Sequence, residues 1–377
     1  MTDTKALVSH GQFSKGGWKI EDVKLRELHD DEVVVEIVAS GLCATDLHCG
    51  DNADDKGIPG VFYPRVLGHE GSGYVAKVGK SVSGLKVGDP VLLSFDYCGD
   101  CHVCKGGPPS HCTQFFAKNF LGDDTFIGQD GKPLNGRFFG QSSFAKHTIV
   151  SENSVVSVAG LGLEREDLKL LAPLGCGIQT GSGTVVNVAK AGPDDLVAIV
   201  GMGGVGLSAV MAAKNQKCRT IIGIDRVQSR LDLAKELGAT HVFNTSDMSM
   251  EDLVAAVREA ADGTGVSVAI DTSGYSPLVV AQVEYTRAMG KIIQIGTGMP
   301  GAQLKIELYD FMIAGKQYIG AVEGHSRTKQ YVPDMVRWWR EGNFPLEKLV
   351  GFYNFEHFEE AVKVMKDGSV VKPVIVW

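Results

Sequence analysis

The chain has 377 residues, of which 44% are apolar and 22% charged, and its formal net charge is −8. This composition is that of a globular protein, and the length predicts two domains, because single hydrophobic cores stop growing at roughly 250 to 300 residues. The acidic balance argues against a nucleic-acid or anionic-membrane surface and favours a small-molecule ligand. The N-terminus lacks the apolar core of a secretory signal and no run of about 18 apolar residues occurs, so we expect a cytoplasmic protein without a membrane span.

The predicted elements change character along the chain. Short β-rich runs separated by Gly, Pro and Asp turn residues extend from Glu32 to about Val150 and predict a glycine-rich β domain. From Leu196 onward, apolar strands alternate with amphipathic helices, which is the pattern of a parallel, doubly wound sheet. After about Gly320, two helical patterns precede a final β-like run at 370–377, which we expect to pack back onto the first domain.

Four cysteines lie in one short segment, CGDCHVCKGGPPSHC: Cys98, Cys101, Cys104 and Cys112. Four thiolates close a tetrahedral zinc shell, and a closed shell leaves no position for substrate, so this spacing predicts a structural zinc site. Unmetallated buried or redox-active thiols and an Fe–S cluster are the alternatives.

Three further candidates are scattered: Cys43 in GLCATDLH, His69 in LGHEG and Cys176 in PLGCGIQTG. A set of two Cys and one His leaves the fourth zinc position open, which is typical of a catalytic zinc that acts as a Lewis acid. Taken alone, a Cys or His is more often a packed structural residue than a ligand, since free cysteine is among the most buried residue types. Cys49 and Cys218 match no ligand position and are interpreted as structural.

A nucleotide site is predicted by Gly201, Gly203 and Gly206, which form GxGxxG between the apolar strand LVAIV and the helix VGLSAVMAAK. Such glycines permit a tight turn, close approach of a pyrophosphate and close helix packing, and the helix N-terminus supplies free N–H groups. Asp225 ends the next strand, where an acid binds the ribose hydroxyls and favours NAD over NADP, although Arg226 beside it could pair with a 2′-phosphate.

The motifs GLCATDLH, LGHEGSGYV, the four-Cys segment, PLGCGIQTGSG, GMGGVG, ELGATH and KPVIV occur in the order found in one family. From about Val33 to the C-terminus the chain resembles the zinc-containing medium-chain alcohol dehydrogenases. Within that family LSFDYCGDC, FFGQSSFA and PLGCGIQTG are most similar to the aryl-alcohol (benzyl alcohol) dehydrogenase branch. The resemblance implies an α/β fold with a Rossmann doubly wound parallel sheet (178–320) and a discontinuous, mostly β, GroES-like catalytic domain (1–177 and 321–377).

The resemblance also implies residue roles. Cys43, His69 and Cys176 would hold a catalytic zinc, with Glu70 as an occasional fourth ligand, giving two zinc ions per chain. Asp46 would accept a hydrogen bond from the imidazole of His69 and so fix its tautomer.

For the proton path, the resemblance implies that Thr45 removes the proton of the alcohol and His48 passes it to solvent. In this mechanism zinc polarises the alcohol oxygen and the alcohol carbon gives hydride to nicotinamide C4. Family members often carry a basic residue where this chain has Ala44, which removes one expected pyrophosphate contact.

The expected cofactor and substrate contacts complete the picture. The residues expected to contact NAD(H) are Gly201, Gly203, Gly204, Val205, Gly206, Thr180, Asp225, Arg226, Arg230 and Lys372. By resemblance, the substrate pocket would be lined by Ser94, Phe138, Phe139 and Thr297, although core packing is an equal explanation for the Phe residues.

The predicted function is therefore NAD-dependent, reversible oxidation of a primary aryl or allylic alcohol to the aldehyde. Two alternatives are an aldehyde reductase or aliphatic or terpenoid alcohol dehydrogenase of a biosynthetic pathway, and a non-catalytic nucleotide-binding protein on the same scaffold. The resemblance further implies a homodimer or homotetramer.

Overall fold

The computed structural model describes residues 2–54, 58–298 and 301–377, and the chain forms two compact units. The first comprises Met1–Cys176, Arg327–Arg337 and Leu346–Trp377; the second comprises Gly177–Ser326 and Trp338–Pro345. The first unit is therefore discontinuous. The second unit differs from the predicted 178–320 by beginning at Gly177, by extending to Ser326 and by including the short segment Trp338–Pro345.

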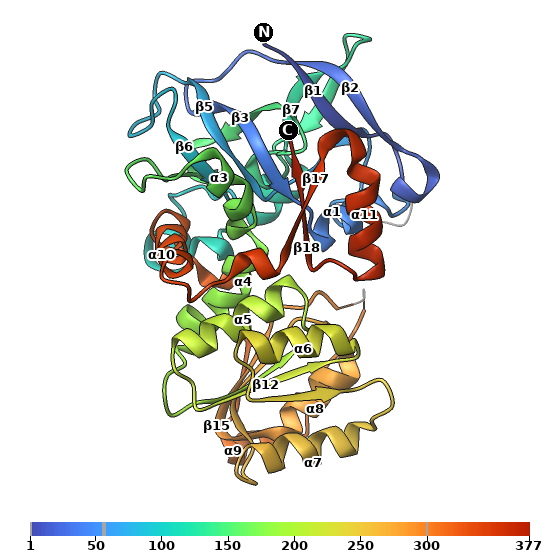
Figure 1. The fold of residues 1–377 in the computed structure, drawn as a ribbon, viewed down its shortest axis with the longest axis vertical. Helices are drawn as coiled ribbons and strands as arrows, with labels where there is room; N and C mark the ends of the chain where they lie inside the picture. Colours follow the sequence, from blue (N-terminus) through green and yellow to red (C-terminus); the bar gives the residue numbers. More distant parts are fainter. Residues whose placement is uncertain (1, 55–57, 299–300) are drawn as a thin grey trace. The chain divides into compact units, whose positions relative to one another are not determined.

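Two β structures make up most of the first unit (Figure 1). A closed barrel contains β1 (Thr2–Ser9), β2 (Trp18–Leu25), β7 (Asp123–Ile127), β8 (Pro133–Gly136) and β4 (Arg65–Val66). A second sheet runs in the order β10 (Val155–Ser157), β6 (Pro90–Leu93), β5 (Gly71–Val78), β3 (Glu32–Gly41), β18 (Lys372–Val376) and β17 (Val350–Asn354), and β9 (His147–Ser151) also pairs with β3.

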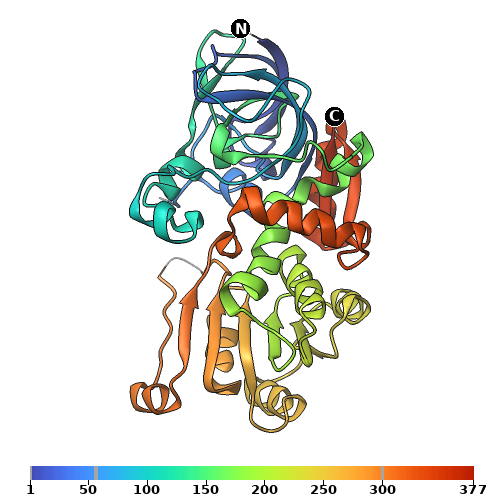
Figure 2. The ribbon, with the colours of Figure 1, turned by 90° about the vertical axis from the view of Figure 1, so that its left-hand side faces the viewer.

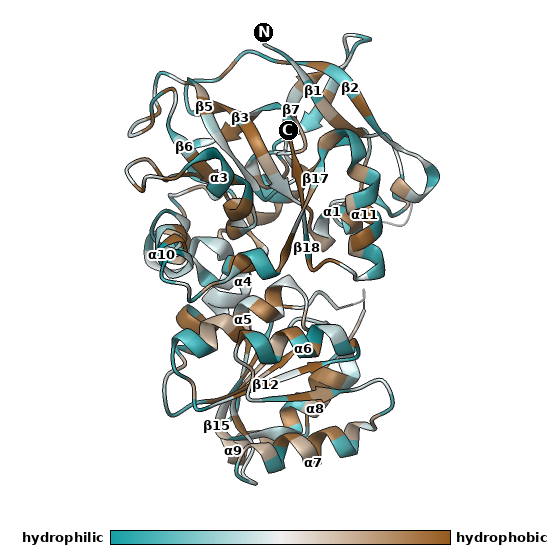
Figure 3. Ribbon diagram, in the orientation of Figure 1, coloured by the Kyte–Doolittle hydropathy of each residue, from teal (hydrophilic) through white to brown (hydrophobic). Residues whose placement is uncertain are grey.

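Strand β3 is hydrophobic along most of its length because both of its faces are buried (Figure 3). Val33, Val35 and Ile37 point into one apolar cluster, whereas Val34 belongs to another. This alternation follows from the two-residue period of a strand. The C-terminal strand β18 pairs antiparallel with β3, so the last residues of the chain join a sheet whose other strands, apart from β17, come from the first half of the chain. This C-terminal segment is red in Figures 1 and 2.

The helices of the first unit are short. They are α1 (Ala44–Gly50), α2 (His102–Gly106), α3 (Arg165–Leu171) and α11 (Phe358–Asp367), together with the first ten residues of α10 (Thr328–Arg340). Helix α1 begins directly after β3 and its preceding residue, Cys43, caps its N-terminus. The site described below is built around this strand-to-helix junction.

The second unit is a six-stranded parallel sheet in the order β13, β12, β11, β14, β15, β16. Its strands are β11 (Leu196–Val200), β12 (Thr220–Asp225), β13 (His241–Asn244), β14 (Val266–Asp271), β15 (Thr286–Gln294) and β16 (Gln317–Gly320). Its helices are α4 (Gly177–Gly183), α5 (Gly204–Asn215), α6 (Gln228–Leu237), α7 (Met250–Ala260), α8 (Ser276–Tyr285) and α9 (Leu308–Ala314). The strand order reverses between β11 and β14, as in a doubly wound dinucleotide-binding fold, so the predicted fold class is confirmed.

Within the described ranges, no helix combines the length and the apolar character that crossing a membrane requires.

Candidate metal centres and cofactor site

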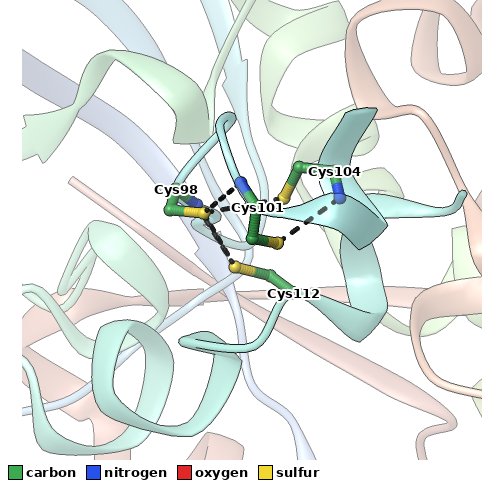
Figure 4. A group of neighbouring side chains, drawn as sticks. All are labelled: Cys98, Cys101, Cys104 and Cys112. Atoms are coloured by element: carbon green, nitrogen blue, oxygen red, sulfur yellow. Dashed lines mark hydrogen bonds between the residues drawn. The ribbon is translucent and has the colours of Figure 1, made fainter. Parts of the chain in front are cut away.

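The four cysteines of the CGDCHVCKGGPPSHC segment converge on one point (Figure 4). Cys98 Sγ lies 3.5 Å from Cys112 Sγ and 3.9 Å from Cys104 Sγ. Four sulfurs at 2.3 Å from a tetrahedral zinc would be about 3.8 Å apart, so these spacings fit a zinc ion. The N–H groups of Cys98, Cys101 and Cys104 each donate to a sulfur of the cluster, which stabilises thiolate charge.

A second cluster brings together residues that are far apart in the sequence. One ligand atom from each of Cys43, His69, Glu70 and Cys176 lies within 4.8 Å of the others. Cys43 precedes α1, His69 and Glu70 precede β5, and Cys176 is the last residue of the first unit before α4. The scattered candidates therefore meet in one place, as ligands of a single ion must.

Asp46 fixes the orientation of His69. Its Oδ1 lies 3.0 Å from His69 Nδ1 and accepts from the Gly68 N–H at 3.0 Å, while its Oδ2 accepts from the Cys43 N–H at 2.9 Å. Asp46 and the His69 side chain are fully buried. A carboxylate at Nδ1 leaves Nε2 to face the cluster, which is the arrangement that prepares a histidine for a metal ion.

The residues of this cluster fit a metal cation. His69 Nε2 is buried and makes no hydrogen bond to any described residue, which is costly unless an ion completes it. A hydrogen bond with Cys176 and the charges of Lys372 and His69 hold the pKa of Cys43 well below its ordinary value, although desolvation opposes this. Desolvation lowers the pKa of His69, but the negative charges of Asp46 and Cys43 outweigh it and raise that pKa well above its ordinary value. The same negative charges would attract a zinc cation.

Glu70 has a partner on the C-terminal strand. Lys372 Nζ lies 2.8 Å from Glu70 Oε1 and donates to the Leu42 carbonyl at 3.3 Å. Burial disfavours the ammonium, but the charges of Glu70 and Cys43 raise the pKa of Lys372 above its ordinary range. The structure thus places Lys372 beside a candidate ligand, and its expected contact with the cofactor stays a prediction.

Helix α1 carries both expected proton-transfer residues. Cys43 Sγ lies 3.8 Å from Thr45 Oγ1, so the hydroxyl is beside the cluster. His48 follows three residues later, which places it on the same helical face as Thr45, and it is exposed to solvent. The order of groups along the helix is therefore ligand, hydroxyl, exposed imidazole.

Two of the expected pocket residues pack against His69. The Phe139 ring stacks on the imidazole at a centroid distance of 4.5 Å, and the Phe138 ring meets it edge-on at 5.3 Å. Ser94 Oγ donates to the Gly175 carbonyl at 2.6 Å, next to the candidate ligand Cys176. Thr297 belongs to the second unit.

The three motif glycines of the second unit play different roles. Gly201 has φ +88, and a Cβ there would collide with Thr272 Oγ1. A Cβ on Gly206 would collide with the Gly201 carbonyl oxygen, so this glycine is needed for helix packing. A Cβ on Gly203 would meet no described atom within 4 Å, and this open position at the N-terminus of α5 is where a pyrophosphate would approach. Gly204 and Val205 begin that helix.

The remaining expected cofactor residues lie around this loop and elsewhere in the second unit. Asp225 ends β12 and its carboxylate accepts from the Met202 N–H at 2.6 Å and the Val227 N–H at 2.9 Å. Arg226 is exposed and Arg230 is half-buried. Thr180 on α4 donates to Glu323 Oε2 at 3.3 Å, a contact that the sequence did not suggest.

Comparison with known proteins identifies the family. Residues 29–160 match the model of the alcohol dehydrogenase GroES-like domain, and residues 204–340 match that of the zinc-binding dehydrogenases. The geraniol dehydrogenase of Castellaniella defragrans is 38% identical over 367 residues, which cover 96% of this chain and 95% of that one. This chain belongs to the zinc-containing medium-chain alcohol dehydrogenases.

Solved structures of this alcohol dehydrogenase family support the assignment over the whole length. The benzyl alcohol dehydrogenase of Acinetobacter calcoaceticus is 39% identical, with a TM-score of 0.90 and coverage of 100% of this chain and 99% of that one. An alcohol dehydrogenase zinc-binding domain protein from Burkholderia ambifaria is 37% identical, with a TM-score of 0.92 and the same coverage. The predicted family is confirmed, and the chain is a zinc-dependent alcohol dehydrogenase.

The sequence did not single out three polar residues that shape the site of this dehydrogenase. Gln141 Nε2 donates to the carbonyls of His69 and Ser94, and its Oε1 accepts from the Gly71 N–H, so it ties the ligand segment to the end of β6. Arg65 is fully buried, with its guanidinium over the Phe138 ring at 4.7 Å. Arg137 directly precedes the two phenylalanines. The only indication in the sequence was the motif FFGQSSFA, which contains Gln141 but neither arginine.

Proposed function

We propose that this zinc alcohol dehydrogenase oxidises primary aryl or allylic alcohols to aldehydes, reversibly, with hydride transfer to NAD. The observation that carries the proposal is the contact of Phe139 and Phe138 with the His69 ring, which puts aromatic surface beside a candidate metal ligand. Two of its relatives are named for benzyl alcohol and geraniol, primary alcohols whose carbinol carbon adjoins an unsaturated carbon. Flat unsaturated groups pack well against such rings.

The roles of the metal ligands follow from the cluster. Cys43, His69 and Cys176 would hold one zinc ion, with Glu70 within reach as an alternative ligand, and the four-cysteine cluster would hold a second. A zinc ion at the first position would supply a Lewis acid that favours ionisation of the alcohol. Asp46 keeps His69 in the tautomer that presents Nε2.

The chain's own residues would move the proton. The Thr45 hydroxyl, beside Cys43, would accept the proton of the alcohol, and His48, exposed on the same face of α1, would release it to water.

NAD is the proposed cofactor, bound by the second unit. The open position at Gly203 and the free N–H groups at the start of α5 suit a pyrophosphate, and Asp225 at the end of β12 suits unmodified ribose hydroxyls. Thr180, Arg226 and Arg230 from this unit, and Lys372 from the first, are the other proposed contacts. An acid at the end of β12 repels a 2′-phosphate, so NAD is favoured over NADP.

Zinc content and turnover test this proposal together. We expect two zinc ions per chain and NADH formation with benzyl alcohol and geraniol, with NADP at least tenfold less effective. Cys43→Ala should lose one zinc and all turnover, whereas Cys101→Ser, the matched change in the other cluster, should lose one zinc and mainly lower the melting temperature. Cys43→Ala with full activity would overturn the mechanism, and two zincs with turnover of ethanol alone would overturn the substrate class.

We also propose that the chain forms a homo-oligomer, a dimer or tetramer, through the edge of the six-stranded sheet. Strand β16 lies at that edge, and beside it α9 exposes apolar side chains: Leu308 is 79%, Tyr309 65%, Met312 64% and Ile313 67% exposed. The outer edge of such a strand, which pairs with β15 on one side only, and an apolar face of this kind are usually covered by a partner. Ile313→Glu should produce monomers in analytical ultracentrifugation; unchanged assembly would refute this interface. The cytoplasmic location stays a prediction.

A further inference from the structure

The turn from Arg137 to Ser142 has an unusual backbone. Three of its non-glycine residues adopt positive φ: Arg137 at 54°, Phe139 at 51° and Ser142 at 54°. Such conformations are unfavourable for residues with a Cβ, and three of them in six residues persist only where surrounding contacts hold them. The turn therefore requires an explanation beyond local sequence preference.

Arg137 supplies the main contacts at the start of the turn. Its Nη1 donates to Glu32 Oε1 at 3.1 Å, and its Nη2 donates to Asp96 Oδ2 at 3.3 Å. Both carboxylates are buried, with Glu32 1% and Asp96 0% exposed, whereas the Arg137 side chain is 18% exposed and its Nη1 also lies 3.8 Å from Oδ2 of the exposed Asp123. At the other end, Ser142 Oγ accepts from the Phe138 N–H and donates to the Val66 carbonyl. The backbone is thus fixed from both sides.

Held in this way, the turn presents two aromatic rings to His69. Phe139 stacks on the imidazole and Phe138 meets it edge-on, while the Arg65 guanidinium covers Phe138. Rotation of the backbone at Arg137 would move both rings, because they follow it directly in the chain. The position of this aromatic wall is therefore coupled to the ion pairs of Arg137.

We propose that Arg137 is a positioning residue that sets substrate preference: its ion pairs with Glu32 and Asp96 hold Phe138 and Phe139 where they favour flat, unsaturated alcohols over small saturated ones. The inference rests on the proposed function, because it assumes that the substrate lies against this wall. It adds a residue that does not itself touch the substrate.

The chain contains a matched control for a purely structural role. Arg26 also pairs with Glu32, through two hydrogen bonds of 2.7 and 2.8 Å, but it lies on the segment after β2, whose hydrogen bonds involve Glu27, Glu32 and residues 123–125 rather than the aromatic turn. Removing Arg26 weakens the pairing of the same buried carboxylate but leaves Arg137 with its own contacts to Glu32 and Asp96. A difference in substrate preference between the two arginine variants therefore reports on the positions of Phe138 and Phe139 and not on general stability.

The experiment compares wild type with Arg137→Gln, Arg137→Lys and Arg26→Gln, using benzyl alcohol, geraniol and ethanol as substrates. We expect Arg137→Gln to lower the ratio of kcat/KM for benzyl alcohol to that for ethanol at least tenfold, mainly through KM, with both zinc ions retained. Arg137→Lys should recover part of the ratio, because it keeps the charge. Arg26→Gln should leave this ratio of kcat/KM values within twofold of wild type, even if its melting temperature falls as far as that of Arg137→Gln.

If Arg137→Gln fails to fold, a double-mutant cycle with the conservative variant Arg137→Lys still tests the proposal. Arg137→Lys and Phe139→Leu should be non-additive in kcat/KM for benzyl alcohol if Arg137 acts through the ring, and additive if it does not. Equal loss of the ratio in the Arg26 and Arg137 variants, or additivity in the cycle, would overturn the inference while leaving the proposed function intact. A wild-type enzyme that shows no preference for unsaturated alcohols would instead refute the proposed substrate class and the inference with it.

Discussion

Lys372 Nζ lies 2.8 Å from Glu70 Oε1, and both side chains are buried inside the first unit. Breaking a buried ion pair from one side leaves an uncompensated charge, which typically costs about 3 to 5 kcal/mol. We therefore expect Lys372→Met to lower the free energy of unfolding by about that amount in urea titrations. Lys372→Met combined with Glu70→Gln should recover much of the loss. If the single variant were as stable as wild type, the pair would not hold the C-terminal strand in place.

The lowered pKa of Glu32 leads to a prediction about how the stability of the protein changes in acid. Burial raises the pKa of Glu32, but hydrogen bonds from Arg26 and the His29 N–H, and the charges of Arg26 and Arg137, bring it below its ordinary value of 4.5. A carboxylate whose pKa is lower in the folded state stabilises the protein above the unfolded pKa, and this contribution is lost as the pH falls through the folded pKa. Glu32→Gln should therefore be less stable than wild type at pH 7 by about 2 kcal/mol, with the gap narrowing between about pH 5 and pH 3.

Urea unfolding at several pH values checks this, with Glu27→Gln as the control because Glu27 is exposed on the same segment. Loss of zinc in acid affects all three proteins alike, so the difference between them isolates Glu32. A constant gap between wild type and Glu32→Gln down to pH 3 would contradict the prediction.

Asp46 should control zinc affinity without being a ligand. Its carboxylate holds His69 Nδ1 and two backbone N–H groups, so Asp46→Asn should present His69 less well and weaken zinc binding about 10- to 100-fold. Competition with a chromophoric chelator would show one zinc per chain released more easily and the other unchanged. Asp54→Asn, an exposed change nearby, should behave as wild type. Two zincs held as tightly in Asp46→Asn as in wild type would refute the role of Asp46.

Substitutions at Gly203 and Gly206 should have different effects, the first on cofactor binding and the second on stability. A Cβ on Gly203 meets no described atom, so Gly203→Ala should keep the melting temperature of wild type but raise the Kd for NADH at least tenfold, because the methyl group occupies the approach of the pyrophosphate. A Cβ on Gly206 collides with the Gly201 carbonyl, so Gly206→Ala should lower the melting temperature. NADH binding followed by protein fluorescence, alongside thermal unfolding, measures both. Unchanged NADH affinity in Gly203→Ala would place the pyrophosphate elsewhere.

The sequence predicted those parts of the site that depend on local spacing. All members of the four-cysteine segment, and all those of the GxGxxG loop, lie within a short stretch of sequence. Short backbone turns are therefore enough to bring them together. Cys43, His69 and Cys176 were candidates from their residue types, and the resemblance of their motifs to a known family grouped them as one site; no local spacing does so, because their convergence depends on the whole β structure. Their separation along the chain carries no local signal.

Arg137 and Arg65 could not be found in the same way. A charged residue is expected at the surface unless it is paired, and the hydrogen-bond partners of Arg137 are Glu32 and Asp96, which are remote in sequence. The burial of Arg65 between Phe62 and Phe138 likewise depends on packing that no local pattern encodes. Gln141 lay within a recognised phrase, but its contacts with His69 and Gly71 are tertiary.

The members of the four-cysteine cluster lie close together in the chain, whereas those of the Cys43 cluster lie far apart. This difference predicts which cluster forms first. The sulfurs of one come from Cys98 to Cys112, whereas those of the other extend from Cys43 to Cys176. A tenfold longer loop costs about 2 kcal/mol more to close, and the longer one also requires β3 and β5 to have paired. In the proposed two-zinc enzyme, a nascent chain would therefore bind zinc at the four-cysteine cluster once Cys112 has left the ribosome, whereas the other cluster would form only after most of the unit had been synthesised and folded.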